Sequence, residues 1–373
     1  MKYFDYASST PVDPQVLDTY EKVLKEYYVN SDSLYPEGLK VNSLMNKSRH
    51  QVADLLRVKD NEILFTSGGS EANNMAIKGI ALRHMEKGRH IITSSIEHSS
   101  VLNSCRWLEK NLGFEVTYLP VNREGKVDPE DVRKAIRDDT VLVSVMMVNN
   151  ESGAIQPIDE IKKIVRRYPN CFMHVDCVQA LGKMPVDLKD IDLASFSAHK
   201  IYGLKGSGIL MKKQHVQLEP LISGGKQEQH LRGGTENSPA NMVWGKTLRL
   251  AMENIEEHYE SVKQFNEYLR SELLKTDSIV INSPDDALPY VLNFSCLKIQ
   301  SEVMMNALAL RGYCVSAQST CESGNAVSHV ISQMFREPDR LKGTIRLSLS
   351  YHQTMDDMKA IIKDLKEIIE KYG

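Results

Sequence analysis

The chain has 373 residues, of which 42% are hydrophobic and 25% are charged, values ordinary for a folded globular protein. Its 46 basic and 49 acidic residues give a formal net charge of −3, which does not indicate a surface for nucleic acid or for a membrane. No apolar run reaches the length of a membrane span, and the start MKYFDYASSTPVDP lacks the features of a signal peptide, so we expect a cytosolic protein.

The cysteines do not form a recognisable framework. They lack a CxxC pair and zinc-site spacing, and they stand at Cys105, Cys171, Cys177, Cys296, Cys314 and Cys321. In a cytosolic chain we expect free thiols, most of them packing as small hydrophobic side chains. At most one of them is expected to carry chemistry.

Strand and helix patterns alternate through most of the chain. NEILFTSGGSEANNMAIKGIALRHMEKG indicates a strand, a turn and a helix, and RHIITSSIEHSSVLNSCRWLEKNLG repeats that scheme. The apolar run TVLVSVMMVNNESG, the helical pattern IDEIKKIVRRYPN and the strands in CFMHVDCVQALG and IDLASFSAH follow. Short apolar strands between helices predict an α/β domain with a mostly parallel sheet covered on both faces.

The pattern changes after a long amphipathic helix predicted in AMENIEEHYESVKQFNEYLRSELLKT. The segments YVLNFSC, QSEVMMNALALRG, GTIRLSLS and TMDDMKAIIKDLKEIIEKYG indicate a compact α+β unit. We therefore predict a large α/β domain over residues 15–258 and a smaller C-terminal α+β domain over residues 259–373. Residues 1–14 are expected to pack against the smaller domain.

Two ionisable residues stand at the ends of predicted strands, where ligands of open parallel sheets bind. Asp176 ends the apolar strand of FMHVDCVQA, and Lys200 follows the strand of SFSAHKIYGLKGSG. Buried together they could simply form an ion pair. They also fit pyridoxal 5'-phosphate (PLP), whose aldehyde forms a Schiff base with lysine and whose pyridine nitrogen is held protonated by a carboxylate.

A phosphate site favours the PLP interpretation. FTSGGSEANN places glycines and Ser70 between a strand and a helix start, where backbone N–H groups and the helix dipole attract anions. Alone, such a loop is often only a helix cap. Ser197 and His199 add donors beside Lys200, and Thr235 lies in a second glycine turn, RGGTENS.

Further polar residues could complete the pocket. His98 follows a strand and could stack on the ring and move protons, although a lone histidine is more often structural. Asn150 and Gln179 could contact the ring hydroxyl and the imine. Arg346 is either an exposed strand arginine or a bidentate clamp for an amino-acid carboxylate.

The ordered motifs FDYASSTPVDP, FTSGGSEANN, EHSS, VNNESG, HVDCVQALGK, SFSAHKIYGLKGSG, RGGTENS and IRLSLS resemble the cysteine desulfurases of the NifS/IscS type over the whole chain. These are PLP-dependent enzymes of fold type I in the aminotransferase superfamily. The resemblance implies a Schiff base at Lys200, a pyridine contact from Asp176, ring stacking by His98, ring contacts from Asn150 and Gln179, and a carboxylate clamp by Arg346. It also implies phosphate contacts from Gly69, Ser70, Ser197 and His199, and from Thr235 of the second subunit of a homodimer.

Cys321 lies in the polar stretch SAQSTCESGNAVSHV, which is typical of an exposed loop. One interpretation is that Cys321 is a loop thiol without a catalytic role. By resemblance it is the nucleophile that takes sulfur from L-cysteine as a persulfide, with L-alanine as the other product. Only the thiolate is competent, and His98 is a candidate acceptor for the thiol proton.

The resemblance implies that the sulfur passes on to an acceptor protein, either an iron–sulfur scaffold or a component of tRNA thiolation or another cofactor pathway. Tyr35 and Gly233 differ from the histidine and serine common in the family. Other reactions on the same scaffold stay open: selenocysteine lyase, cysteine sulfinate desulfination or transamination, although a transaminase has no use for Cys321. An inactive scaffold that only binds a partner is the alternative of a different class.

Overall fold

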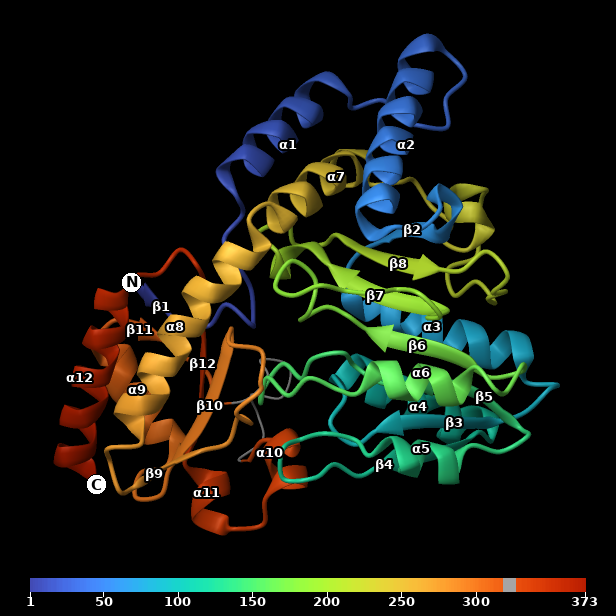
Figure 1. Cartoon of the computed structure of the whole chain (residues 1–373). Coiled ribbons are helices and arrows are strands. Elements are labelled where there is room, and N and C mark those ends of the chain that lie inside the picture. Colours follow the sequence, from blue (N-terminus) through green and yellow to red (C-terminus); the bar gives the residue numbers. More distant parts are fainter. Residues whose placement is uncertain (318–326) are drawn as a thin grey trace.

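The structure is a computed structural model, and it describes residues 1–317 and 327–373 of the chain. Within these residues a seven-stranded sheet with strand order β2-β8-β7-β6-β5-β3-β4 forms the centre of the molecule (Figure 1). Its strands are β2 (Ile63–Thr66), β3 (His90–Ser94), β4 (Glu115–Leu119), β5 (Thr140–Ser144), β6 (Phe172–Asp176), β7 (Leu193–Ser197) and β8 (Gly208–Lys212).

The strands of this sheet run in the same direction, except for one. From β7 to β4 all neighbours pair in parallel, whereas β8 is antiparallel to both β7 and β2. The carboxyl ends of the parallel strands therefore meet at one edge, as the sequence predicts for a mostly parallel sheet. This edge is where open α/β sheets bind ligands.

Helices cover both faces of the sheet because its strands are apolar on both sides. On one face, Leu64 and Ile91 pack with α3 (Gly69–His84) and α4 (Ser99–Leu112). On the other face the neighbouring Phe65 and Ile92 belong to a second cluster, which includes residues of α5 (Pro129–Ala135) and α6 (Ile158–Val165). Figure 1 shows α5 and α6 in front of the sheet and α3 and α4 behind it.

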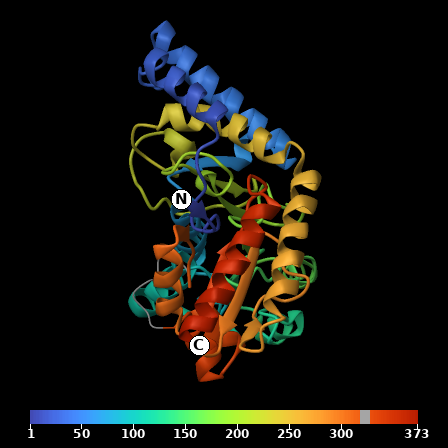
Figure 2. The same cartoon turned by 90° about the vertical axis from the view of Figure 1, so that its left-hand side faces the viewer.

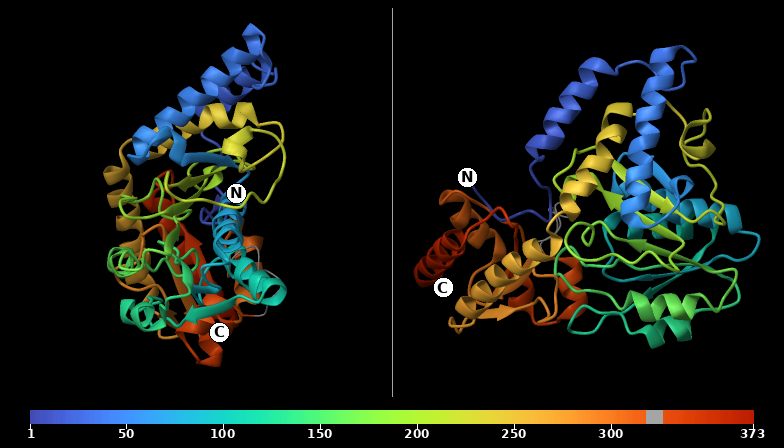
Figure 3. Two further views of the ribbon diagram at one scale, coloured as in Figure 1. Left: turned by 90° about the vertical axis from the view of Figure 1, so that its right-hand side faces the viewer. Right: turned by 45° about the horizontal axis from the view of Figure 1, so that its top comes forward.

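The helices α1 (Pro14–Glu26), α2 (Pro36–Leu56) and α7 (Ser238–Met252) lie beyond the β2 edge of the sheet (Figure 3). The long helix predicted from Ala251 is divided, because Asn254 adopts a left-handed conformation at φ 55° between α7 and α8 (Ile255–Leu273). The turn lets α8 leave the line of α7 and run toward the C-terminal unit.

The C-terminal unit contains a small antiparallel sheet of β9 (Ile279–Ile281), β10 (Val291–Cys296) and β12 (Thr344–Ser348). Its helices are α9 (Ser301–Leu310), α10 (His329–Met334), α11 (Pro338–Lys342) and α12 (Met355–Tyr372). The N-terminal strand β1 (Lys2–Tyr3) pairs in parallel with β11 (Tyr313–Cys314), beside the N-terminus in Figure 2. The domain division at residue 258 stays a prediction, since α8 runs across that position.

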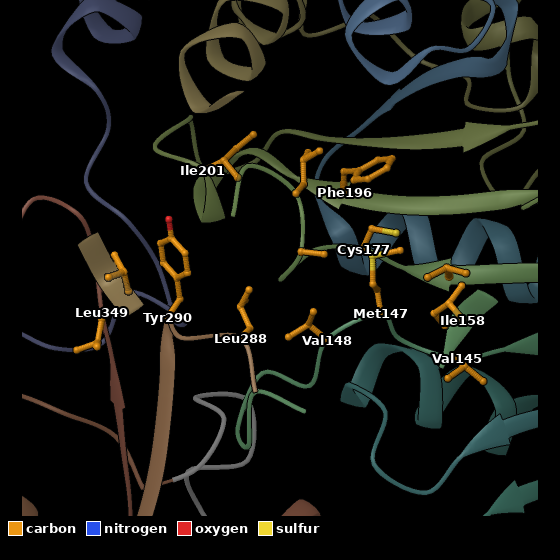
Figure 4. Packing of buried hydrophobic residues seen from close by; sticks show 14 of the residues in the cluster. Val145, Met147, Val148, Ile158, Cys177, Phe196, Ile201, Leu288, Tyr290 and Leu349 are labelled. Atoms are coloured by element: carbon orange, nitrogen blue, oxygen red, sulfur yellow. The ribbon is translucent and has the colours of Figure 1, made fainter. Parts of the chain in front are cut away.

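The two parts of the chain share one hydrophobic core. Cys177 and Phe196 on the side of the central sheet belong to the same cluster as Leu288, Tyr290 and Leu349 from the C-terminal unit (Figure 4). Burial of this apolar surface fixes the strand ends of the central sheet against the small unit. The described helices include none with the length and apolarity that a membrane crossing requires.

Candidate active site

A cleft with about 790 Å³ of empty space, counting its part open to solvent, lies at the carboxyl edge of the central sheet. Most of the polar residues singled out in the sequence line it together: Gly69, Ser70, His98, Asn150, Asp176, Gln179, Ser197, His199, Lys200 and Arg346. They come from the ends of five parallel strands and from β12. The topology therefore brings together side chains that are far apart in the sequence.

One end of the cleft suits an anion. After β2 the chain turns at Gly68 (φ 150°), and α3 begins at Gly69, so that backbone N–H groups of its first turn have no helical acceptors. Gly208 on β8 passes so close that a Cβ there would lie 2.5 Å from the Gly68 Cα. Glu71, in the same turn, is engaged by the Ser67 N–H and by Arg232.

Lys200 stands at the end of a 3-10 turn, Ala198–Lys200, that directly follows β7. Its Nζ donates hydrogen bonds to the carbonyl oxygens of Ala7 and Ser8, both at 2.6 Å. The N-terminal segment thus forms one wall of the cleft, which the sequence did not reveal. An amine anchored by carbonyl oxygens inside a cleft is placed to react with a carbonyl compound.

A second lysine lies near the first. Lys183 is buried, and its Nζ donates to Gln179 Oε1 at 2.8 Å, while Gln179 Nε2 donates to the Ala7 carbonyl at 3.0 Å. Burial, together with the nearby charges of Lys200 and Arg346, lowers the pKa of Lys183 to about 7. The sequence shows this residue only as the last letter of HVDCVQALGK, and its burial could not be foreseen.

Burial and nearby cations also act on His199. Desolvation first, and then Lys200, Lys205 and Lys183, lower the pKa of His199 to about 4. The imidazole is therefore neutral at neutral pH, and Nδ1 lies 3.3 Å from the Ser9 Oγ. A neutral imidazole can contact a phosphate only as a hydrogen-bond donor.

Asp176 ends β6 as a buried carboxylate with two hydrogen bonds. Its Oδ1 accepts from the Val178 N–H at 3.0 Å and its Oδ2 from Asn73 Nδ2 at 2.7 Å. Asn73, on α3, also donates to Ser100 Oγ at 2.9 Å. Asn73 was not among the predicted site residues, although it lies within the segment FTSGGSEANN.

Arg346, on β12, is 1% exposed and not the exposed strand arginine that was one interpretation. Its guanidinium donates to Asp5 Oδ1 at 2.7 Å, to Ser8 Oγ at 2.8 Å and to the Asn150 carbonyl at 2.9 Å. Its Nε is buried without a hydrogen-bond partner within residues 1–317 and 327–373. A cation fixed in this way suits the carboxylate of an amino acid.

Two predicted site residues do not join the cleft. Thr235 is exposed and does not line it. Cys321 lies outside the described residues. The other five cysteines are free thiols, four of them buried and Cys314 partly buried.

The residues present fit PLP. The cleft offers an amine for the aldehyde, a buried carboxylate for the pyridine nitrogen, and at its helix end the backbone N–H groups and hydroxyls that a phosphate requires. An acid, a base and an arginine alone would suit many ligands. PLP is favoured because these groups are combined with a glycine turn, in which Gly68 lies directly against Gly208 of β8.

Comparison with known proteins agrees with this chemistry. Residues 2–361 match the model of the class-V aminotransferase family. The chain is 41% identical to the cysteine desulfurase IscS of Dictyoglomus turgidum, covering 99% of this chain and 94% of that protein. It is 40% identical to IscS of Methanosarcina thermophila, with coverages of 99% and 92%.

Solved structures show the same relationship. A NifS-like protein superimposes with a TM-score of 0.94 at 35% identity, covering both chains completely. SspA, solved in complex with cysteine, superimposes with a TM-score of 0.83 at 35% identity, covering 95% of this chain and all of that one. The enzymes of this group depend on PLP. The chain belongs to the cysteine desulfurase family of the class-V aminotransferases.

Proposed function

We propose that the protein converts L-cysteine into L-alanine and places the released sulfur on Cys321 as a persulfide. The substrate Cβ–S bond breaks and an S–S bond forms at the Cys321 thiolate. The electron pair left on the carbon skeleton takes up a proton. One cysteine and one thiol thus give one alanine and one persulfide, without an external oxidant.

PLP bound in this cleft would act as the electron sink that labilises the substrate Cα–H bond. Lys200 would hold the cofactor in the resting enzyme and, once released by the substrate amine, move the α-proton. Asp176 would keep the pyridine nitrogen protonated. Gly69, Ser70, Ser197 and His199 would hold the phosphate, and Asn150 and Gln179 the ring substituents.

Arg346 would orient the substrate. Its guanidinium is held from Asp5, Ser8 and Asn150 before any ligand binds, so little side-chain entropy is lost on binding a carboxylate. SspA, which shares the fold, was solved with cysteine. That complex supports an amino acid of this size as the substrate.

The observation that carries the proposal is the meeting of Lys200, Asp176 and Arg346 in one cleft beside the α3 N-terminus. A scaffold without activity would have no need to keep a buried arginine and a carbonyl-anchored lysine in the same space. The same three residues would serve a transaminase. The Cys321 thiol distinguishes the two reactions.

Product analysis tests the proposal directly. Purified PLP-loaded protein is given L-cysteine and dithiothreitol, and alanine and sulfide are quantified for the wild type, Cys321→Ala and Lys200→Ala. We expect equal amounts of alanine and sulfide from the wild type. Cys321→Ala should stop both while retaining the absorbance of bound PLP, and Lys200→Ala should lose both.

Formation of pyruvate and ammonia, or of a keto acid by transamination, would reject the desulfurase activity while leaving the cofactor assignment intact. Selenocysteine in place of cysteine in the same assay tests the lyase alternative. A preference for selenocysteine by kcat/KM would reassign the substrate.

We further propose that the working unit is a homodimer, in which Thr235 of one copy completes the phosphate site of the other. The exposure of Thr235 outside its own cleft supports this arrangement. We also propose that an acceptor protein, of the iron–sulfur scaffold or tRNA-thiolation type, takes the sulfur from Cys321. Transfer of radiolabelled sulfur from L-[35S]cysteine to candidate acceptors would test this step.

A further inference from the structure

A chain of hydrogen bonds joins Asp176 to His98, which lines the same cleft. Asn73 Nδ2 donates to Asp176 Oδ2 at 2.7 Å and to Ser100 Oγ at 2.9 Å. Ser100 Oγ lies 2.8 Å from His98 Nδ1. The two groups expected to flank a bound cofactor are therefore connected through two side chains with no assigned role.

The direction of each bond follows from the chemistry of the groups. The Asp176 carboxylate can only accept, so the nitrogen of the Asn73 amide faces it, and that nitrogen donates again to Ser100 Oγ. The Ser100 hydroxyl hydrogen is then available to His98. From Asn73 to Ser100, and from Ser100 to His98, each hydrogen bond is thus donated in the direction of Nδ1.

A second donor reaches the same ring nitrogen. His98 is the N-cap of α4, and its Nδ1 accepts the backbone N–H of Ser100 at 3.2 Å. A nitrogen that accepts an N–H hydrogen bond cannot carry a proton of its own in that plane. The proton of the neutral ring therefore resides on Nε2.

Positively charged or partly positive groups share the cleft with His98. The N-terminus of α4 presents its positive end to the ring. Lys200 and Arg346 line the same cleft. His329, from α10, places its Nε2 3.2 Å from the Glu97 carbonyl oxygen.

The neighbouring carboxyl does not offset these cations. Glu97 is buried and accepts from Ser94 Oγ and the Met146 N–H, and burial raises its pKa to about 8. It is thus mostly uncharged at neutral pH. Among the described residues, hydrogen bonds link the Asp176 carboxylate to the ring through Asn73 and Ser100.

We propose that His98 acts in the reaction as a neutral imidazole that donates a hydrogen bond through Nε2–H, with Asn73 and Ser100 as the positioning residues that hold this tautomer. This inference rests on the proposed function, since it assigns a role in cysteine desulfuration. A neutral histidine at a helix N-terminus is an effective hydrogen-bond donor to developing negative charge. Here that charge develops on the carbon skeleton of the substrate, which keeps the electron pair when the Cβ–S bond breaks.

The role differs from that of a proton acceptor for the Cys321 thiol. An acceptor at Nε2 needs the proton on Nδ1, and the Ser100 N–H would then face another N–H. Loss of the acceptor for one buried N–H shifts such a tautomer ratio by about 10- to 100-fold. The described contacts therefore favour the tautomer in which His98 donates a hydrogen bond through Nε2–H.

The tautomer can be observed without turnover. We would label the PLP-loaded protein with 15N-histidine, assign His98 by comparison with His98→Gln, and record solid-state 15N spectra between about pH 6 and about pH 9. We expect one protonated nitrogen, Nε2, throughout this range. A protonated Nδ1 at neutral pH, in either the other tautomer or the imidazolium, would overturn the proposal.

Variants at Ser100 test the positioning role. Ser100→Ala removes the hydroxyl and keeps the backbone N–H, so we expect a detectable population of the other tautomer and a fall in kcat of about 3- to 10-fold with KM unchanged. Ser100→Thr keeps a hydroxyl, so it should show the Nε2 tautomer and the kcat of the wild type. Ser104→Ala is the matched control, because the Ser104 hydroxyl donates to the Ser100 carbonyl and does not reach the ring. An effect of Ser104→Ala equal to that of Ser100→Ala would refute the positioning role.

Two replacements of His98 separate donor from base. Glutamine carries an amide nitrogen near the position of Nε2, and asparagine carries one near Nδ1, while neither is a base. We expect His98→Gln to keep at least about 10-fold more kcat than His98→Asn, the value of one hydrogen bond to a charged group. Equal loss in both variants would contradict the donor role. If the wild type forms no alanine, the proposed function fails, whereas the 15N spectrum still decides the tautomer.

Discussion

Lys183 gives a quantitative test of the electrostatics behind the cleft. Its side chain is 7% exposed, close to Lys200 and Arg346, and its Nζ donates to Gln179. Burial holds its pKa at about 7, compared with the ordinary value of 10.5. In the folded protein this amine therefore loses its proton near neutral pH.

The depressed pKa determines how stability depends on pH. Between pH 7 and about pH 10 the unfolded chain binds more protons than the folded chain, so the free energy of unfolding rises with pH in this window. Each unit of pKa difference corresponds to about 1.4 kcal/mol, and the full penalty below pH 7 is about 5 kcal/mol. Methionine in this position has similar length and no charge, and Lys183→Met should therefore remove the pH-dependent part.

The same substitution also has a cost that does not vary with pH. Gln179 Oε1 loses its donor, which destabilises the protein by about 1–3 kcal/mol. The informative quantity is therefore the change with pH of the stability difference between the wild type and Lys183→Met. From pH 7 to pH 9 the wild type should gain about 2–3 kcal/mol relative to the variant.

Urea unfolding followed by far-UV circular dichroism measures this difference. Protein concentration and PLP must be the same for both proteins, because dimerisation and ligand binding add to apparent stability. Lys163→Met, at an exposed position of α6, is the control and should show no relative change with pH. Parallel stability curves for the wild type and Lys183→Met over this range would refute the assignment of a neutral buried lysine.

Three further substitutions have effects that follow from the structure. Glu97→Gln should gain stability relative to the wild type as pH rises from about 4.5 to about 8. In that window the folded wild type holds one more proton at Glu97 than the unfolded chain does. Urea unfolding at several pH values measures the difference. Glu228→Gln should lower the free energy of unfolding by about 3 kcal/mol, since it leaves the largely buried Arg49 guanidinium without its carboxylate. Thermal and urea unfolding measure the loss. Gly208→Ala should weaken PLP binding by about 10-fold or more and destabilise the fold by about 1–3 kcal/mol, because its Cβ would meet the Gly68 backbone. Absorbance titration with PLP measures the change in affinity.

Each of these has an outcome that would contradict it. A pH-independent difference for Glu97→Gln would mean that Glu97 is ionised in the folded protein. Unchanged unfolding of Glu228→Gln would show that water reaches the guanidinium. Gly206→Ala, where a Cβ meets nothing within 4 Å, should lose about 1 kcal/mol through its φ of +71° and leave PLP affinity intact. Equal PLP affinity in Gly208→Ala and Gly206→Ala would argue against a role of the Gly208–Gly68 contact in binding the phosphate.

The sequence alone predicted the elements whose signals are local. Apolar strands such as Phe172–Asp176 and Leu193–Ser197 read as buried parallel strands because both faces carry hydrophobic side chains. Polar residues directly after them were expected at one edge of the sheet, since parallel strands end together. The fold class and the family follow from this order of motifs. The break between α7 and α8 was missed because a single left-handed asparagine leaves the helical pattern of its neighbours intact.

Only the tertiary structure decided how the site is built around those strand ends. The carbonyl oxygens of Ala7 and Ser8 accept hydrogen bonds from the Lys200 amine, which lies 193 and 192 residues further along the chain, and Asp5 holds Arg346 across 341 residues. Hydrogen bonds over such separations leave no periodic trace in the sequence, because they depend on packing of the N-terminal segment between the two parts of the molecule. The burial of Lys183 has the same origin. Sequence fixes which groups a chain carries, and packing decides which of them lose water and therefore change their proton affinity.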